Sequence, residues 1–180
     1  MPDLLSLPDF VARMRRLTSP IVDASGVQTF LDGHLIEPAS IEPYLHYTAG
    51  RYTRHLVFKN AAVEILVLCW ARGSRAPIHG HEGELCWARV ERGRLRFTGY
   101  REHSRSPLRL SPVGHPLDGG PGHVDGPADI HAVETIGDDA VSLHVYVKPY
   151  EECDIYDLAQ GVVQRVRLSY DSVPEHPVAP

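Results

Sequence analysis

The sequence predicts a mainly β protein, an antiparallel sandwich or small jelly-roll barrel preceded by short helices. Eight short runs rich in β-branched and aromatic residues follow one another from residue 52 on, and no long helical pattern lies between them. Pro and Gly clusters, such as the one at residues 119–122, separate these runs. Only the first 45 residues show helical spacing. We therefore expect one domain over residues 1–180, with a helical segment at 1–45, a β-barrel at 46–170 and an irregular tail at 171–180.

The helical segment is predicted from its apolar spacing. Phe10, Met14 and Leu17 recur at helical intervals after a Pro-Asp start, while three arginines fall mostly on the opposite side. We expect two further short helices near residues 25–31 and 38–45. The second of them begins with a proline at an early position, where the missing N–H costs nothing.

The barrel is predicted from the β-rich runs. The turn sequence Glu91-Arg92-Gly93 falls between two of them and predicts a hairpin there. The predicted strands are Tyr52–Lys59, Val63–Trp70, Cys86–Arg92, Arg94–Tyr100, Pro107–Val113, Ala128–Ile136, Val141–Tyr146 and Gln164–Leu168.

Composition excludes several classes of function. The 180 residues carry a net charge of -5, which argues against a nucleic-acid or anionic-membrane partner. No apolar run approaches the roughly 20 residues of a membrane helix. The first residues lack the basic-then-apolar order of a signal peptide, and three cysteines give no disulfide framework, so we expect a cytoplasmic location. We also expect a monomer.

Three histidines in separate fragments, His79, His81 and His131, are the candidate metal ligands. Residues two apart in a strand point to one face, so His79 and His81 could both point into a barrel. His131, on a later strand, would complete a facial triad if that strand lies beside the first. Three imidazoles without a carboxylate leave a divalent ion its full charge, which attracts an anionic substrate such as a thiolate. Such His-x-His pairs also occur on surfaces by chance.

The residues around this pair resemble the first cupin motif, with Cys86 where cupins generally carry a glutamate ligand. The resemblance implies a double-stranded β-helix barrel with the metal inside and makes His131 the histidine of the second motif. The spacing that carries it is Gly73-x5-His79-x-His81-x4-Cys86-x6-Gly93.

The chain as a whole resembles cysteine dioxygenase over about residues 45–160. This resemblance implies that the three histidines hold a non-haem ferrous ion, Fe(2+), and that L-cysteine is oxidised with O2 to cysteine sulfinic acid. The small thiol substrate would bind through its sulfur and amine. Besides the His79 segment, the matching segments are Tyr52-Thr53-Arg54-His55-Leu56-Val57, Leu68-Cys69-Trp70, Ile130-His131-Ala132-Val133-Glu134 and Ser142-Leu143-His144-Val145-Tyr146.

The resemblance also implies roles around the metal. Arg54 would clamp the substrate carboxylate, because its guanidinium fork fits a carboxylate with two hydrogen bonds. Tyr52 would hydrogen-bond near the same carboxylate, or serve only as a packing aromatic. Tyr146 would place its hydroxyl beside the sulfur and oxygen, with His144 and Ser142 supporting it. An ordinary buried core histidine is the alternative interpretation of His144.

Cys86 is a candidate for a thioether cross-link to Tyr146, because some cysteine dioxygenases join a cysteine at this position to that tyrosine. We expect the two side chains to lie within linking distance, and the link to depend on turnover with iron and oxygen. The alternative is that Cys86 is a small, buried apolar residue.

Three other functions compete with this interpretation. Dioxygenases of 3-mercaptopropionate or another small thiol typically carry glutamine at the arginine position and lack the cysteine, so Arg54 and Cys86 favour cysteine itself. A zinc hydrolase or lyase would use the three histidines with Glu84 or Glu134 as general base. A non-catalytic cupin that binds a small molecule is often joined to a DNA-binding domain, and the sequence shows no helix-turn-helix pattern.

Overall fold

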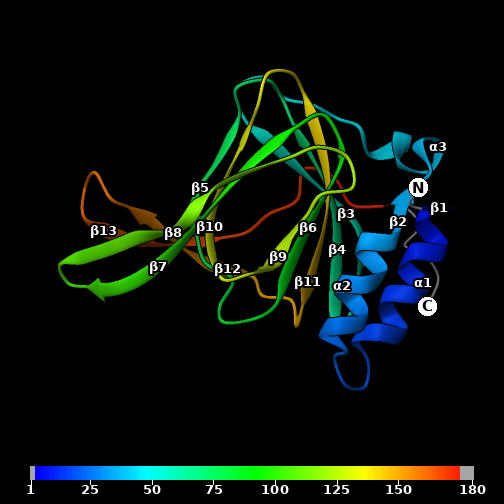
Figure 1. The fold of residues 1–180 in the computed structure, drawn as a ribbon, viewed down its shortest axis with the longest axis horizontal. Helices are drawn as coiled ribbons and strands as arrows, with labels where there is room; N and C mark the ends of the chain where they lie inside the picture. Colours follow the sequence, from blue (N-terminus) through cyan, green and yellow to red (C-terminus); the bar gives the residue numbers. More distant parts are fainter. Residues whose placement is uncertain (1–2, 175–180) are drawn as a thin grey trace.

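The computed structural model describes residues 3–174, in which two antiparallel β-sheets face each other and two helices cover one of them (Figure 1). The first sheet has five strands, and every neighbouring pair in it is antiparallel. Its strands in spatial order are β3 (Tyr52–Lys59), β4 (Val63–Trp70), β11 (Ala140–Val147), β6 (Cys86–Arg92) and β9 (Val124–Ala128).

The second sheet has six strands and extends beyond the first as a long, exposed hairpin of β7 and β8 (Figure 1). Its neighbouring pairs are antiparallel as well. The strands in spatial order are β13 (Val162–Arg167), β12 (Glu152–Asp157), β5 (Arg75–His79), β10 (Ile130–Thr135), β7 (Leu95–Arg105) and β8 (Leu108–Gly119).

The central strands β4 and β11 are buried on both faces, which explains their continuous apolar sequence. Alternate residues of each strand belong to two different cores. Leu143 and Val145 pack with the helices, whereas Leu66, Leu68 and Tyr146 belong to the core between the sheets. His144 and Ser142, which alternate with Leu143 and Val145 on β11, therefore point between the sheets, as Tyr146 does.

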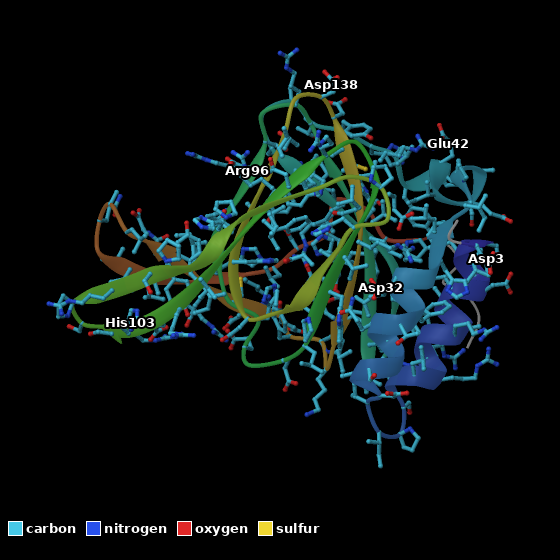
Figure 2. All side chains as sticks on the ribbon, in the orientation of Figure 1. Asp3, Asp32, Glu42, Arg96, His103 and Asp138 are labelled. Carbon is cyan, nitrogen blue, oxygen red and sulfur yellow. The ribbon has the colours of Figure 1, made fainter. Side chains whose placement is uncertain are left out.

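The helices cover the outer face of the five-stranded sheet (Figure 1). Helix α1 (Leu7–Thr18) is capped by Ser6, whose hydroxyl accepts the backbone N–H of Asp9 at 3.2 Å. Exposed charged side chains such as Asp32 and Asp138 point outward (Figure 2). The remaining elements are β1 (Asp3–Leu5), α2 (Ala24–Gly33), β2 (His34–Ile36), α3 (Pro38–Ile41) and η1 (Glu42–Tyr44).

The predicted hairpin at Gly93 is wrong. Gly93 does turn the chain with a positive φ of 70°, but β6 and β7 on either side of it belong to different sheets. A Cβ at this position would lie 2.4 Å from the carbonyl oxygen of Asp139, so only glycine fits. The turn therefore carries the chain from one sheet to the other.

Several predicted boundaries also differ from the structure. The predicted strand at 128–136 is β10, and five strands are additional to those predicted: β1, β2, β5, β9 and β12. β5 is short and holds a proline, while β12 is acidic at both ends, so neither has an apolar run that predicts a strand. The predicted helix at 38–45 is the short α3 followed by η1. The predicted tail is irregular as far as residue 174, and residues 175–180 lie outside the described part.

Candidate metal centre

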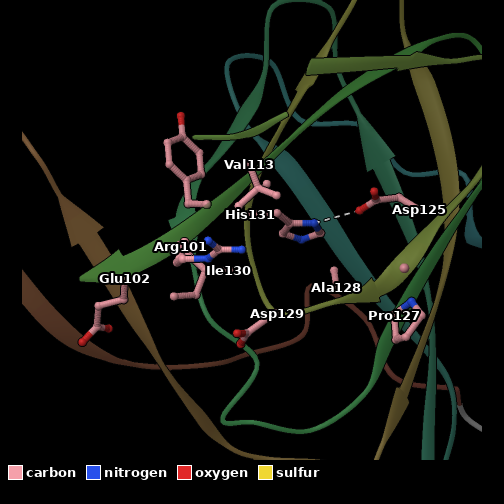
Figure 3. A pocket seen from close by; sticks show the side chains of 12 residues that line it. Arg101, Glu102, Val113, Asp125, Pro127, Ala128, Asp129, Ile130 and His131 are labelled. Atoms are coloured by element: carbon pink, nitrogen blue, oxygen red, sulfur yellow. Dashed lines mark hydrogen bonds and ion pairs between the residues drawn. The ribbon is translucent and has the colours of Figure 1, made fainter. Parts of the chain in front are cut away.

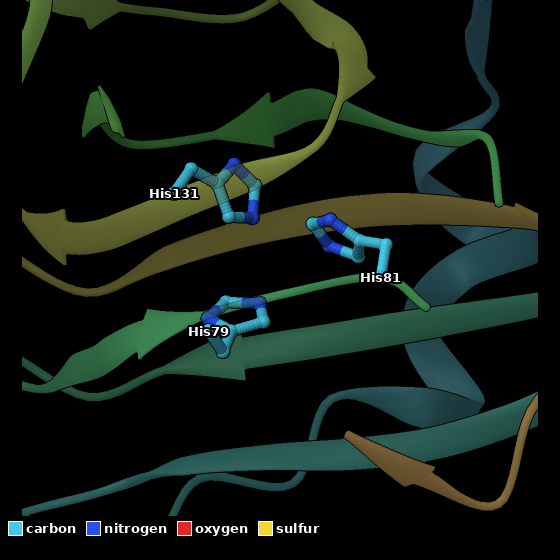
Figure 4. Close-up of side chains that lie close together, drawn as sticks. All are labelled: His79, His81 and His131. Atoms are coloured by element: carbon cyan, nitrogen blue, oxygen red, sulfur yellow. The ribbon is translucent and has the colours of Figure 1, made fainter. Parts of the chain in front are cut away.

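The three histidines come together at one end of the six-stranded sheet (Figure 4). His79 is the last residue of β5 and lies directly opposite His131 on β10. His81 lies in the loop beyond β5, so the strand alternation used to place it does not apply. The backbone N–H of Gly80, which donates to the carbonyl of Asp154 at 3.0 Å, holds the chain where the loop begins.

Each ring is held through its Nδ1 atom. The partners are the carbonyl of Pro77 for His79 at 2.8 Å and the carbonyl of Asp129 for His81 at 2.5 Å. A carbonyl oxygen only accepts hydrogen bonds, so these two rings carry their proton on Nδ1 and leave the Nε2 lone pair free. The candidate ligand nitrogens of the three rings lie within 4.8 Å of one another.

The free nitrogens lack partners in the part of the chain that the structure describes. Nε2 of His81 and Nε2 of His131 are buried without a hydrogen bond, which is costly for a polar atom unless a ligand binds it. Burial, helped by the neighbouring His131, lowers the pKa of His79 to about 3 and lowers the pKa of His81 well below its ordinary value. His79 and His81 are therefore neutral at physiological pH, the form that binds a metal. The triad fits a divalent metal ion.

The sequence analysis missed one residue of this centre, Asp125. Its carboxylate lies 3.0 Å from Nδ1 of His131 (Figure 3). The centre thus includes a carboxylate, which contacts the ring of His131 and is not itself a candidate metal ligand. A carboxylate in this position orients the imidazole ring and makes it a better electron donor to a metal. A hollow of about 490 Å³ lies on this side of His131, but neither Arg54 nor Tyr146 lines it.

A second cavity, of about 440 Å³, brings most of the predicted site residues together. Its size suits a small ligand. Among its lining residues are His79, Arg54, Tyr52, His144 and Tyr146, from the three strands β5, β3 and β11. Glu84 and Glu134, the candidate general bases of a zinc hydrolase, do not line it; they lie near Lys148 at 3.7 Å and Arg96 at 3.8 Å, respectively.

Arg54 is buried on β3 and its side chain lines this cavity. Nη1 donates to the carbonyl of Ser169 at 3.3 Å, and the guanidinium carbon lies 5.7 Å from the centre of the Tyr170 ring. Within residues 3–174, no carboxylate pairs with the guanidinium. A buried cation without an anionic partner is costly, so this group is suited to an anionic ligand. Tyr52, by contrast, stacks on Trp70 with ring centres 4.9 Å apart.

A chain of hydrogen bonds on β4 and β11 ends at Tyr146. The indole N–H of Trp70 donates to the Ser142 hydroxyl at 2.8 Å, Ser142 lies 2.9 Å from Nε2 of His144, and Nδ1 of His144 lies 3.2 Å from the Tyr146 hydroxyl. The indole only donates, so the Ser142 hydroxyl accepts from it and has its own proton available for Nε2. In the tautomer that accepts this proton, His144 carries its own proton on Nδ1 and donates to the Tyr146 oxygen. The Tyr146 hydroxyl is thereby free to donate toward the cavity.

Burial keeps this chain uncharged. It lowers the pKa of His144 and, with a smaller contribution from Cys86, raises the pKa of Tyr146 well above its ordinary value. Tyr146 on β11 lies directly opposite Cys86 on β6, so their Cβ atoms are neighbours on one face of the sheet. Cys86 itself is fully buried and does not line the cavity.

The family model of cysteine dioxygenase type I matches residues 5–159. The chain belongs to this family. Human cysteine dioxygenase type 1 is 25% identical over 156 residues, which cover 84% of this chain and 78% of the human protein. The zebrafish (Danio rerio) protein of the same name is 24% identical over 172 residues, which cover 92% and 86% of the two chains.

Solved structures of cupins are also similar to this chain. A cupin superfamily protein from Desulfitobacterium hafniense has a TM-score of 0.47 at 15% identity and matches 63% of this chain and 92% of its own. A double-stranded β-helix protein from Klebsiella pneumoniae has a TM-score of 0.41 at 15% identity. The two facing sheets and the membership of the family confirm the predicted mainly β cupin fold.

No helix in the described residues is both long and apolar enough to cross a membrane.

Proposed function

We propose that the protein is a non-haem iron dioxygenase that oxidises L-cysteine with O2 to cysteine sulfinic acid. The observation that carries this proposal is the single cavity shared by His79, Arg54 and Tyr146. It offers a metal ligand, a cation for a carboxylate and a hydroxyl donor to one small molecule. A zinc hydrolase would leave Arg54 and Tyr146 without a role and has no carboxylate base among the nominated residues.

Fe(2+) is the metal that we propose for the centre. Imidazole nitrogens suit iron, and three ligands on one face leave positions open for a substrate. When bound there, iron would supply the redox chemistry by which both atoms of O2 reach the thiolate sulfur. The protein's part is to fix the three imidazoles, which their Nδ1 partners do.

Arg54 would bind the carboxylate of cysteine. The guanidinium keeps N–H donors beyond the one used by Ser169, and two parallel N–H groups match a carboxylate. This clamp would fix the distance from the carboxylate to the metal centre, so the sulfur and amine of the substrate face the open positions. Tyr52 borders the same part of the cavity as a packing aromatic.

Tyr146 would donate a hydrogen bond to the reacting end of the substrate. Its oxygen already accepts from His144, so its own proton is left for the cavity. A donor aimed where negative charge develops on oxygen stabilises the transition state, and removal of one such donor typically costs about 10²–10³ in kcat. Ser142 and Trp70 support His144 from behind.

The thioether between Cys86 and Tyr146 forms, in this proposal, during turnover with iron and O2. A bond joins Sγ to the ring carbon beside the hydroxyl, and two electrons and two protons pass to O2. Support comes from the cross-strand pairing of the two residues. Mass spectrometry of the intact chain after turnover with cysteine should show the loss of two hydrogen atoms, and the Cys86→Ser variant should not show it.

Oxygen consumption by the iron-loaded protein tests the function. We expect rapid uptake with cysteine, slower uptake with 3-mercaptopropionate and cysteamine, and cysteine sulfinate as the product by mass. A preference for 3-mercaptopropionate would keep the reaction and overturn the substrate. No uptake with any thiol by protein with bound ferrous iron would overturn the dioxygenase proposal in favour of a zinc enzyme or a binding module.

A further inference from the structure

The segment that follows β13 lies along β3 and completes the cavity wall around Arg54. The backbone N–H of Asp171 donates to the carbonyl of Arg54 at 2.8 Å, and that of Leu56 donates to the carbonyl of Ser172 at 3.0 Å. Leu168 and Ser169 of this segment line the cavity. The irregular chain end is therefore part of the site, and Tyr170 lies in its middle.

Tyr170 is held firmly by charged groups at its hydroxyl. The hydroxyl donates to Oε1 of Glu64 and accepts from Nζ of Lys59 at 2.9 Å, and Lys59 lies 3.6 Å from the same carboxylate oxygen. Glu64 is buried at 2% exposure, so its carboxylate needs these partners. With one hydrogen bond given and one received, the orientation of the phenol ring is fixed.

The same ring packs against the guanidinium of Arg54, whose central carbon lies 5.7 Å from the ring centre. A guanidinium stacked on an aromatic face is attracted by the ring quadrupole, while the N–H groups at its edge stay free for hydrogen bonds. The bond to Glu64 places negative charge on the hydroxyl side of the ring and strengthens this attraction. Tyr170 also fills space from which Arg54 could otherwise turn toward the buried Glu64.

We propose that Tyr170 is the positioning residue for Arg54 and that it gives the site its preference for thiols that carry a carboxylate. This inference rests on the proposed function, in which Arg54 binds the substrate carboxylate. Without the ring, the guanidinium of Arg54 loses its stacking partner and is free to turn and pair with the carboxylate of Glu64. The carboxylate of the substrate then loses its partner, whereas a thiol without a carboxylate loses nothing.

The test compares Tyr170→Leu and Tyr170→Phe with the parent protein, using cysteine and cysteamine as matched thiols. The two substrates share the thiol and the amine and differ in the carboxylate. Phe58→Leu is the control, because it removes an arginine–aromatic contact of similar length, with Arg15 at 5.4 Å, and Phe58 packs with the helices and does not line the cavity of Arg54. Iron content and thermal stability are measured for every variant.

We expect Tyr170→Leu to raise KM for cysteine by about tenfold with kcat little changed, and to leave KM for cysteamine within about twofold. Tyr170→Phe, which keeps the ring, should retain most of the affinity, and the Phe58→Leu control should match the parent in KM for both thiols. An equal rise of KM for both thiols would mean general damage to the pocket and would overturn the inference. An unchanged KM for cysteine in Tyr170→Leu would overturn it too.

Calorimetric binding of cysteine and cysteamine to iron-loaded protein without oxygen separates this inference from the proposed function. A parent that consumes no O2 with any thiol would overturn the proposed function alone. The calorimetric binding measurement would still decide the role of Tyr170. Weaker binding of cysteine but not of cysteamine by Tyr170→Leu supports it, and the absence of that difference overturns it.

Discussion

At the scale of single residues, the candidate metal centre depends on the group that accepts a hydrogen bond from, or lies beside, Nδ1 of each histidine. Two rings are held by backbone carbonyls and the third by the Asp125 carboxylate. A carbonyl fixes the tautomer of the ring, whereas a carboxylate also places a negative charge behind it. Of the three candidate ligands, His131 is the one with a carboxylate behind its ring.

Replacement of Asp125 by Asn should weaken metal binding by about 10- to 100-fold, because the charge behind His131 is lost while the shape is kept. Competition with a chelator of known affinity measures this on metal-free protein. Asp129→Asn is the matched control: this residue holds His81 only through its backbone carbonyl. Equal affinity of Asp125→Asn and the parent protein would contradict the role of the carboxylate.

The sequence could predict which side chains come together, but not the residues that hold them in place. The histidine spacing identifies three rings that form one cluster in the structure, and the segments around Arg54 and Tyr146 identify side chains that share a cavity with His79. Asp125 lies on β9, whose Gly-Pro sequence does not predict a strand, and Tyr170 lies in an irregular segment, so no periodicity assigns a direction to either side chain. Their contacts depend on the pairing of distant segments, which one sequence does not reveal.

At the scale of elements, β4 and β11 position the cavity relative to the helical layer. Each is buried on both faces, so one strand serves the helices with one set of residues and the cavity with the other. Both strands are mostly apolar runs with turn signals at their ends, and their predicted ranges agree with the structure to within one residue. The hairpin at Gly93 was predicted wrongly because a glycine turn specifies a reversal but not the sheet that the next strand joins.

The helical layer is fastened to β6 by a buried ion pair. Arg89 donates to Glu91 at 2.6 Å and to the carbonyl of Leu31 in α2 at 3.2 Å, and its guanidinium packs on Phe10 of α1. Glu91 in turn accepts the backbone N–H of Ile36 in β2 at 3.1 Å. The pair thus joins three N-terminal elements to the barrel.

Replacement of Arg89 by Met should lower the free energy of unfolding by about 3–5 kcal/mol, because Glu91 would remain buried without its partner. The double variant Arg89→Met/Glu91→Leu should lose less than the single one. Urea unfolding measures both. As a control, Arg96→Met removes an exposed pair with Asp118 and should cost only about 0–1 kcal/mol. A loss as small as that of the control for Arg89→Met would contradict the fastening role.

At the scale of the whole molecule, we expect a metal ion at the triad to stabilise the fold, because only the folded chain brings the three histidines together. A metal ion present at about 100 times its Kd adds about 2.7 kcal/mol. For a chain of this size, that corresponds to a rise of about 5–10 °C in Tm. The rise should vanish in His131→Ala and persist in His115→Ala, an exposed histidine on β8. A rise that persists in His131→Ala would place the metal elsewhere.

The measurement that tests the central claim most directly is turnover of cysteine by the iron-loaded protein under ¹⁸O₂ in ordinary water. If the His79–His81–His131 centre carries out dioxygenation, both oxygen atoms of the sulfinate product are ¹⁸O. A product with one labelled oxygen, or with oxygen only from water, would contradict the account.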